Sequence, residues 1–375
     1  MSDDSDIQLN YYETPELHFQ DLKTLVLECT EKFKAEPTLL KVNYPVMIVG
    51  DIHGQYKDLE RILALPMAKN VELARDVKRI VFLGDYIDRG PASIPCLITL
   101  MLLKVKHPRS YSLLRGNHET EAVNGGCYGF KAELAERYKR IGEQNALFRL
   151  INDMFDYLPL AALVGKRILC MHGGISPHLT SLEAIDQIKR PISNIFSVPL
   201  AGDLLWSDPK HINTDFEPNP IRGVSVYFSE KAVQDTCKRL NLDFIVRAHQ
   251  VMYNGYSFFA GVKMITVFSC PRCALDSKAA VMVITKKKEM GFAFLGPNKS
   301  DKLSTDKEFK EKFGYLDKLQ QAEDIGGPPN PDRSEDTKGN DSNSASLNDS
   351  PKPKEVKKEV KPTKKAKHKS GKLGK

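Results

Sequence analysis

The sequence has little that would suit a secreted or membrane-spanning protein. Its longest apolar run, Ile94–Leu103, is about half of the ~20 residues that a membrane-spanning helix needs. The first residues, MSDDSD, have neither the basic region nor the apolar core of a secretory signal. Seven cysteines are scattered along the chain, and only Cys270 and Cys273 share C-x-x-C spacing. We therefore predict a soluble protein of the reducing cytoplasm, the nucleus or both, in which this cysteine pair is incidental.

Outside the end of the chain, the sequence has no excess of positive charge. The net charge of the 375 residues is +7, but residues 351–375 hold eleven Lys against two Glu, which leaves −2 for residues 1–350. Charge therefore does not suggest that the body binds nucleic acid. Apolar content falls from about Ser300 onward. We predict one domain in residues 1–300 and a disordered tail in residues 301–375, polar at first and then Lys-rich.

The tail has three interpretations. The simplest is a solvated segment that keeps the protein soluble, because a Lys-rich stretch without aromatic residues cannot build a core. The run KKAKHK also fits a nuclear-import signal. A weak electrostatic contact with nucleic acid or acidic partners is the third interpretation, without sequence-specific recognition.

Short β-branched runs alternate with helical patterns in the body, which indicates an α/β architecture with part of the sheet antiparallel. Residues 1–45 have apolar spacing typical of a mainly helical segment. The predicted strands are Val46–Gly50, Arg79–Leu83, Ser110–Leu114, Arg167–Met171, Phe244–Arg247 and Met264–Phe268. The predicted helices include Gln55–Leu65, Ser93–Lys106, Phe130–Arg140, Ala146–Tyr157 and Ser229–Leu240.

Polar side chains follow five of these strands directly, next to glycines that permit tight turns. Ligands of α/β proteins bind at the carboxyl ends of strands, so we expect these side chains to meet. Oxygen and imidazole donors without thiolates suit divalent manganese, iron or zinc. A carboxylate can bridge two ions, and two ions can activate a water for attack on phosphorus. The predicted metal ligands are Asp51, His53, Asp85, Asn117, His172 and His249.

Four further residues could complete a phosphoester hydrolase. His118 follows a predicted ligand directly, and Asp88 could orient it as the acid that protonates the leaving oxygen. Arg89 and Arg222 lie in glycine-flanked turns, and their guanidinium groups could bind phosphate. Taken singly, each of these residues is more often structural, and only their repeated position after strands favours a site.

The runs GDIHGQ, GDYIDRG, RGNHE, HGG and RAHQV resemble the signature of the phosphoprotein phosphatase family of serine/threonine phosphatases. The resemblance covers roughly residues 20–297, and LLWSDP, RGVS and GYSFFA look most like the type-one catalytic subunits or a divergent relative. It implies a calcineurin-like metallophosphoesterase fold, which is a central β-sandwich of mixed sheets flanked by helices. It also implies hydrolysis of phosphoserine and phosphothreonine in proteins by water activated at two metal ions, with Mn²⁺ expected and Fe or Zn as alternatives.

The resemblance assigns roles to the same residues. Asp51 and His53 would bind one ion, and Asp85 would bridge to a second. Three residues would bind that second ion: Asn117, His172 and His249. His118 with Asp88 would protonate the leaving group, while Arg89, Arg222 and Asn117 would bind phosphate.

The sequence departs from the family pattern in two places. The usual SAPNYC run reads Phe268-Ser269-Cys270-Pro271-Arg272-Cys273 here, without the active-site tyrosine of the loop that follows it, and Ile221 replaces an acidic residue before RGVS.

Type-one relatives bind regulatory subunits in an apolar groove. The positions of this chain that match the groove are Ile168, Phe244, Phe258 and Met290, although plain core packing explains these apolar residues equally well.

Two other functions stay open from the sequence. A catalytically weak or inactive scaffold with this fold could bind regulatory partners alone. A metallophosphoesterase acting on nucleotides or nucleic acid would share GDIHG and GNHE, although LLWSDP, RGVS and RAHQV favour the protein phosphatase.

Overall fold

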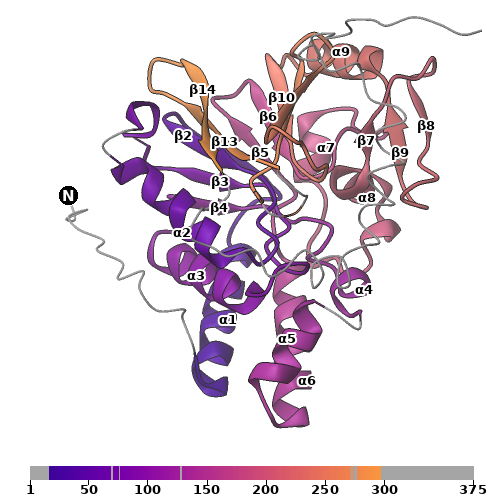
Figure 1. Ribbon diagram of the computed structural model, residues 1–375. Coiled ribbons are helices and arrows are strands. Elements are labelled where there is room, and N and C mark those ends of the chain that lie inside the picture. Colours follow the sequence, from indigo (N-terminus) through magenta and orange to yellow (C-terminus); the bar gives the residue numbers. More distant parts are fainter. Residues whose placement is uncertain are drawn as a thin grey trace, which may run out of the picture. The chain divides into compact units, whose positions relative to one another are not determined.

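Two β-sheets pack face to face, and helices cover the outer face of each (Figure 1). The computed structural model describes residues 17–296 except 69, 70, 76, 127, 128, 272 and 274–276. The six-stranded sheet runs in the order β1 (Leu39–Val42), β5 (Ala161–Val164), β6 (Ile168–Met171), β10 (Phe244–Arg247), β12 (Met264–Val267) and β11 (Tyr256–Phe259). The five-stranded sheet runs β14 (Met290–Leu295), β13 (Ala279–Ile284), β2 (Val46–Val49), β3 (Ile80–Phe82) and β4 (Tyr111–Leu113).

Side chains alternate between two cores along β2, as expected for a strand buried on both faces. Met47 and Val49 pack in the core beneath the helices, whereas Val46 and Ile48 pack in the core between the sheets. In the six-stranded sheet, Leu169 on β6 faces away from the five-stranded sheet, and Cys170 faces toward it. The result is a helix–sheet–sheet–helix sandwich.

The helices divide between the two outer faces of the sandwich. A small third sheet consists of β7 (Asp208–Pro209), β9 (Val226–Phe228) and β8 (Phe216–Pro218), and stands beside the helices that cover the six-stranded sheet. The first group covers the five-stranded sheet and comprises α1 (Phe19–Lys34), α2 (Tyr56–Ala64), α3 (Ser93–Lys106), α5 (Phe130–Arg137) and α6 (Ile141–Phe155). The second group covers the six-stranded sheet and comprises α7 (Leu182–Asp186), α8 (Pro199–Trp206) and α9 (Glu230–Arg239). One further short helix is α4 (Glu121–Asn124), and 3₁₀ turns span Leu65–Met67, Glu72–Ala74 and Ile195–Ser197.

Strand direction brings the polar loops together. β2, β3 and β4 are parallel neighbours, so the loops after them leave the same edge of the five-stranded sheet. β6 and β10 are parallel neighbours in the other sheet, and their following loops leave at one edge as well. These five strand ends are the ones at which the sequence predicted polar ligands.

One prediction from the sequence was wrong, and another left out a strand. Helix α1 agrees with the mainly helical segment predicted in residues 1–45, but residues 39–42 of that segment form strand β1, because parallel pairing with β5 buries Leu39 and Leu40 on opposite faces of the sheet. Cys270 and Cys273 were predicted to be incidental, yet form a disulfide. The turn after β12 brings their Cα atoms to 5.5 Å, within the range that a disulfide spans.

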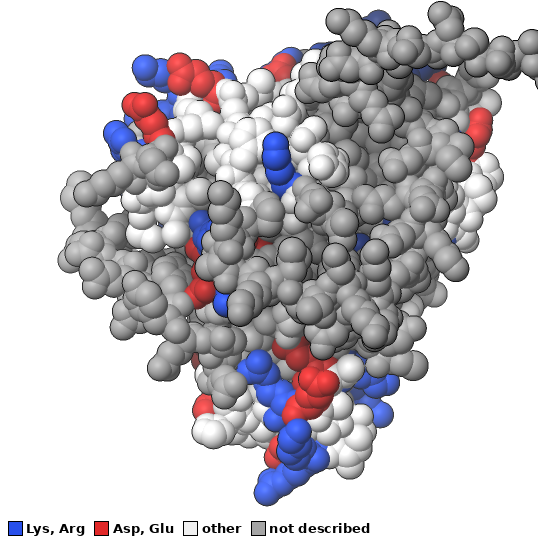
Figure 2. Space-filling view, viewed as in Figure 1, with Lys and Arg blue, Asp and Glu red and all other residues white. Residues whose placement is uncertain are grey.

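Basic and acidic side chains are intermixed on the face shown in Figure 2, where described residues are visible. This agrees with the nearly neutral charge of residues 1–350. Among the described helices, none combines the length and apolar character that crossing a membrane requires. The predicted tail, residues 301–375, lies outside the described residues.

Candidate active site

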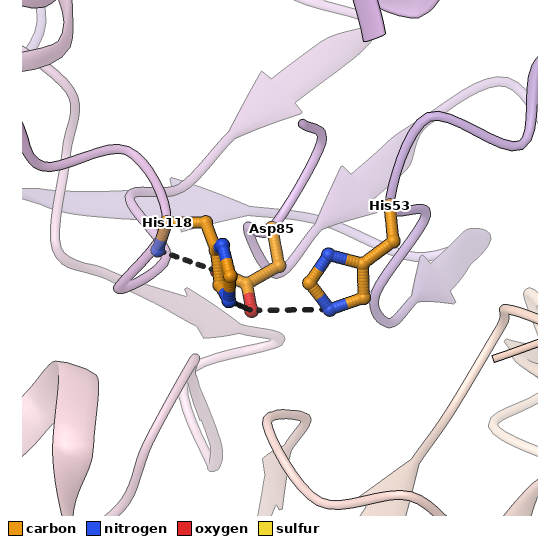
Figure 3. Close-up of side chains that lie close together, drawn as sticks. All are labelled: His53, Asp85 and His118. Carbon is orange, nitrogen blue, oxygen red and sulfur yellow. Dashed lines mark hydrogen bonds and ion pairs between the residues drawn. The ribbon is translucent and has the colours of Figure 1, made fainter. Parts of the chain in front are cut away.

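Asp85 lies at the centre of a buried cluster of imidazoles and oxygens. Its Oδ2 atom is 3.5 Å from His53 Nε2 and 3.4 Å from His172 Nε2. Figure 3 shows the carboxylate between His53 and His118. Ligand atoms about 2.1 Å from a shared ion are about 3–3.5 Å apart, so this spacing fits metal coordination. Two groups could each hold an ion: one of His53, Asp85 and His118, the other of Asp85, His172 and His249.

Hydrogen bonds leave the lone pairs of two imidazoles aimed at this centre. His53 Nδ1 donates to the carbonyl of Ile87 at 3.0 Å, and His172 Nδ1 donates to the carbonyl of Leu83 at 3.1 Å. A carbonyl can only accept, so in the neutral form of each imidazole the lone pair is on Nε2, which faces the centre. His53 Nε2 is buried without a hydrogen-bond partner. Imidazoles that bind metals are oriented by such hydrogen bonds at the opposite nitrogen.

The remaining predicted ligands lie in the same cluster. Asp51 Oδ2 is 3.6 Å from His53 Nε2, on the side of the first group. In the second group, His172 Nε2 is 2.9 Å from Asn117 Oδ1 and 3.1 Å from His249 Nδ1. Asp51 also accepts the backbone N–H of His249 at 3.0 Å, which links the two sheets at the site. All six predicted ligands therefore converge.

Burial and mutual charge set the protonation of the cluster. Burial would raise the pKa of Asp85, but His172, His118 and His53 outweigh it and hold this pKa well below its usual range. Burial lowers the pKa of His249 well below its ordinary value, and Arg222, His172 and Arg247 lower it further. An ionised carboxylate beside a neutral imidazole is the donor set that a divalent ion requires.

His118 and Asp88 form a separate pair at the edge of the cluster. His118 Nδ1 is 2.8 Å from Asp88 Oδ2, and the backbone N–H of His118 donates to Asp85 Oδ1 at 2.9 Å. His118 Nε2 is 4.0 Å from Asp85 Oδ2, farther than the Nε2 atoms of His53 and His172. Burial lowers the pKa of His118, while Asp85 and Asp88 oppose that effect.

Backbone strain is concentrated in these loops. His53, Asp85, Asp88, Arg89 and His249 all have φ between 47° and 70°, a region that non-glycine residues seldom adopt. Such strain persists only where the surroundings hold it, and it gathers at functional sites.

The two arginines predicted to bind phosphate lie near the cluster. Arg89 is close enough to His118 to lower its pKa, and Arg222 has the same effect on His249. Arg222 Nε donates to Asp208 Oδ2 at 2.9 Å. Asp208 also accepts from Arg247 Nη2 at 3.0 Å, so one carboxylate aligns two guanidinium groups.

Sequence reasoning missed three supporting residues. Glu119 is fully buried, and its oxygens accept the backbone N–H groups of Asp85, Tyr86 and Gly116 at 2.7, 2.8 and 3.0 Å. Asp208 and Arg247 form the ion pair described above. Each belongs to a quoted run, RGNHE, LLWSDP or RAHQV, which is the signal that could have found them.

Comparisons with known proteins agree with this geometry. Residues 44–253 match the calcineurin-like phosphoesterase family. The chain is 40% identical over 286 residues to serine/threonine-protein phosphatase PP1-delta of Caenorhabditis elegans, covering 76% of this chain and 90% of that one. The chain belongs to the phosphoprotein phosphatase family.

Other relatives of this phosphatase support the same placement. It is 40% identical over 283 residues to another serine/threonine-protein phosphatase of Caenorhabditis elegans, covering 74% of this chain and 59% of that one. A solved structure from Saccharomyces cerevisiae, a protein serine/threonine phosphatase similar to human phosphatase PP5, has a TM-score of 0.67 and 24% identity. The match covers 76% of this chain and 92% of the yeast chain, and shows the shared fold. The predicted family, fold and enzyme class are confirmed.

Proposed function

We propose that this phosphatase hydrolyses phosphoserine and phosphothreonine side chains of proteins at the cluster around Asp85. The observation that carries the proposal is the position of its carboxylate, at 3.5 and 3.4 Å from two imidazole nitrogens whose opposite nitrogens are bonded to carbonyls. This is the arrangement expected of a bridging ligand. We assign catalysis to residues 1–300 as one domain.

The donor set fits two divalent ions. Asp51 and His53 would hold one ion and Asp85 would bridge. The ligands of the second ion would be Asn117, His172 and His249. Oxygen and imidazole donors favour Mn²⁺, with Fe or Zn as alternatives. When bound, the two ions supply Lewis acidity, which polarises the phosphoryl group and lowers the pKa of water.

The chain's own residues position the substrate and supply a proton. Arg89 and Arg222 would bind the phosphate oxygens with Asn117, and Asp208 orients the Arg222 guanidinium for this task. The serine or threonine oxygen that leaves is a strong base and needs a proton. His118, held by Asp88 at 2.8 Å, would deliver it.

Purified protein with manganese tests this proposal. We expect turnover of a phosphoserine peptide, and a loss of about 10²-fold or more in Asp85→Asn and in His118→Asn. Glu121→Gln, on the exposed surface of α4, is the matched control and should retain activity. Elemental analysis should find about two ions per chain. A folded protein with two ions and no turnover would instead indicate a scaffold.

Substrate class is tested by direct competition. Faster turnover of a dinucleotide than of phosphopeptides would favour the nucleotide phosphoesterase over the protein phosphatase. We expect the opposite order, since the similarity extends to the LLWSDP, RGVS and RAHQV runs beyond the metal ligands.

Exposed apolar side chains on two edge strands support binding of regulatory subunits. Phe258 on edge strand β11 is 48% exposed and Met290 on edge strand β14 is 52% exposed, whereas Ile168 and Phe244 are buried. An extended peptide could dock beside such edges. Phe258→Ala should reduce recovery of proteins that co-purify with the full chain, and Val262→Ala, at an exposed position outside this set of four residues, should not.

The Lys-rich tail is proposed to act outside catalysis. Removing residues 351–375 should leave peptide turnover unchanged and reduce nuclear accumulation if KKAKHK directs import. The same truncation should weaken retention on immobilised nucleic acid at low salt. Unchanged distribution and retention would leave the solvated tail as the explanation.

A further inference from the structure

Helix α5 begins beside the residue pair that we assign to protonate the leaving group. The backbone N–H of Phe130, its first residue, donates to Asp88 Oδ1 at 2.7 Å. The other oxygen, Asp88 Oδ2, is 2.8 Å from His118 Nδ1. One carboxylate therefore connects the start of the helix to the imidazole.

The position of this N–H group is tightly determined. The Phe130 side chain is fully buried, and its ring lies 6.3 and 6.4 Å from the rings of Phe148 and Phe155 on α6. Gly129 before it has φ of +96°, and a Cβ atom there would lie 2.3 Å from Asp88 Oδ1. Only glycine permits this approach of the backbone to the carboxylate.

The first turn of α5 also holds the loop that carries Asp88. Glu133 accepts the backbone N–H groups of Ser93 and Ile94, the first two residues of α3, at 2.7 and 2.9 Å. Ser93 Oγ in turn accepts the backbone N–H of Asp88 at 3.1 Å. These bonds form a closed circuit from α5 through α3 to Asp88.

Asp88 needs such support. Its φ of 66° is unfavourable for a residue with a side chain, so the loop holds this conformation only through its contacts. The circuit fixes its backbone through Ser93 and its carboxylate through Phe130. Free rotation of the carboxylate would release His118 from the orientation in which Nε2 faces the cluster.

We propose that the turn from Gly129 to Glu133 is a positioning element for proton transfer by His118 and Asp88. This inference rests on the proposed function. It implies that the turn matters for substrates with a poor leaving group, such as the alkoxide of serine. An aryl phosphate releases a weakly basic phenolate, which needs little protonation, so its hydrolysis should depend far less on the turn.

Two substrates measure this difference. Glu133→Ala and Gly129→Ala would be assayed for kcat with a phosphoserine peptide and with p-nitrophenyl phosphate under saturating manganese. We expect about a tenfold loss on the peptide and less than about a threefold loss on the aryl phosphate. Glu136→Gln, on the exposed face of the same helix, is the control and should match the unmodified protein on both.

The ratio of the two rates separates positioning from general damage. Because a Cβ at Gly129 is strained, Glu133→Ala decides the outcome, with circular dichroism confirming its fold. Equal losses on both substrates, or no loss on the peptide, would overturn the inference.

His118→Asn run in parallel separates this inference from the proposed function. It should show the same preference for the aryl phosphate, more strongly. If His118→Asn loses both activities equally, the assigned acid is wrong and the inference falls with it. If His118→Asn shows the preference for the aryl phosphate and the two α5 variants do not, the assignment of His118 as the acid is supported and the positioning role of the turn is ruled out.

Discussion

At the scale of single residues, Glu119 shows how a side chain outside the predicted ligand set can shape a candidate metal site. Its two oxygens accept hydrogen bonds from three backbone N–H groups of the loops that carry Asp85 and Asn117. The carboxylate thereby holds the strained backbone of Asp85, whose φ is 55°. Buried acceptors of this kind are costly to remove, because the donors that face them are left unpaired.

Glu119→Gln should weaken metal binding. The amide –NH₂ would face a backbone N–H in place of an accepting oxygen, which should shift the Asp85 loop. We expect a loss of about tenfold or more in Mn²⁺ affinity, measured by calorimetry, since residues that support metal ligands contribute about 10–100-fold. Glu121→Gln, two residues on and exposed, is the control. Unchanged affinity in Glu119→Gln would show that the loop holds itself.

At the scale of elements, helix ends place the strands that carry ligands. Ser229 caps α9, since its hydroxyl accepts the backbone N–H of Ala232 at 3.1 Å. The helix then leads to β10, which ends at Arg247, two residues before His249. A well-formed α9 therefore determines where one ligand strand begins.

Ser229→Ala should lower the free energy of unfolding by about 1 kcal/mol, because the first turn of α9 loses its capping acceptor. Urea denaturation of the metal-free protein would measure the change. Gln234→Ala, on the exposed side of the same helix, provides the comparison and should be nearly neutral. If Gln234→Ala lost as much stability as Ser229→Ala, the cap would not be the cause.

At the scale of the whole described body, the site joins two sheets. Asp51, Asp85 and Asn117 follow strands of the five-stranded sheet, while His172 and His249 follow strands of the six-stranded sheet. Ions held by ligands from both sheets would link them, and anything that binds only the folded state stabilises it.

Removing metal should therefore lower the melting temperature. A free metal concentration of about 100 times the dissociation constant stabilises the folded state by about 2.7 kcal/mol. For a domain of this size, that corresponds to a rise in melting temperature of about 5 °C. We expect EDTA to lower Tm by that order and added manganese to restore it, as measured by calorimetry. Asp85→Asn, which lacks the bridging carboxylate, should respond much less. An EDTA effect of equal size in that variant would place the stabilising ion elsewhere.

The sequence by itself determined the family, the enzyme class and the chemistry of the cluster. Alternating apolar runs end in glycine-flanked Asp, His and Asn, and parallel strands bring such ends to one edge of each sheet. The six ligands could therefore be predicted from the sequence, and in the structure they converge where the two sheets pack together.

Only the tertiary structure decided which residues hold that cluster in place. Asp208 meets Arg247 across 39 positions, Asp88 meets Phe130 across 42, and β1 pairs with β5 far along the chain. The Cys270–Cys273 disulfide likewise depends on the course of the turn after β12. The local spacing of residues in the sequence does not predict such contacts, because they form when separate elements pack and satisfy one another's buried polar groups.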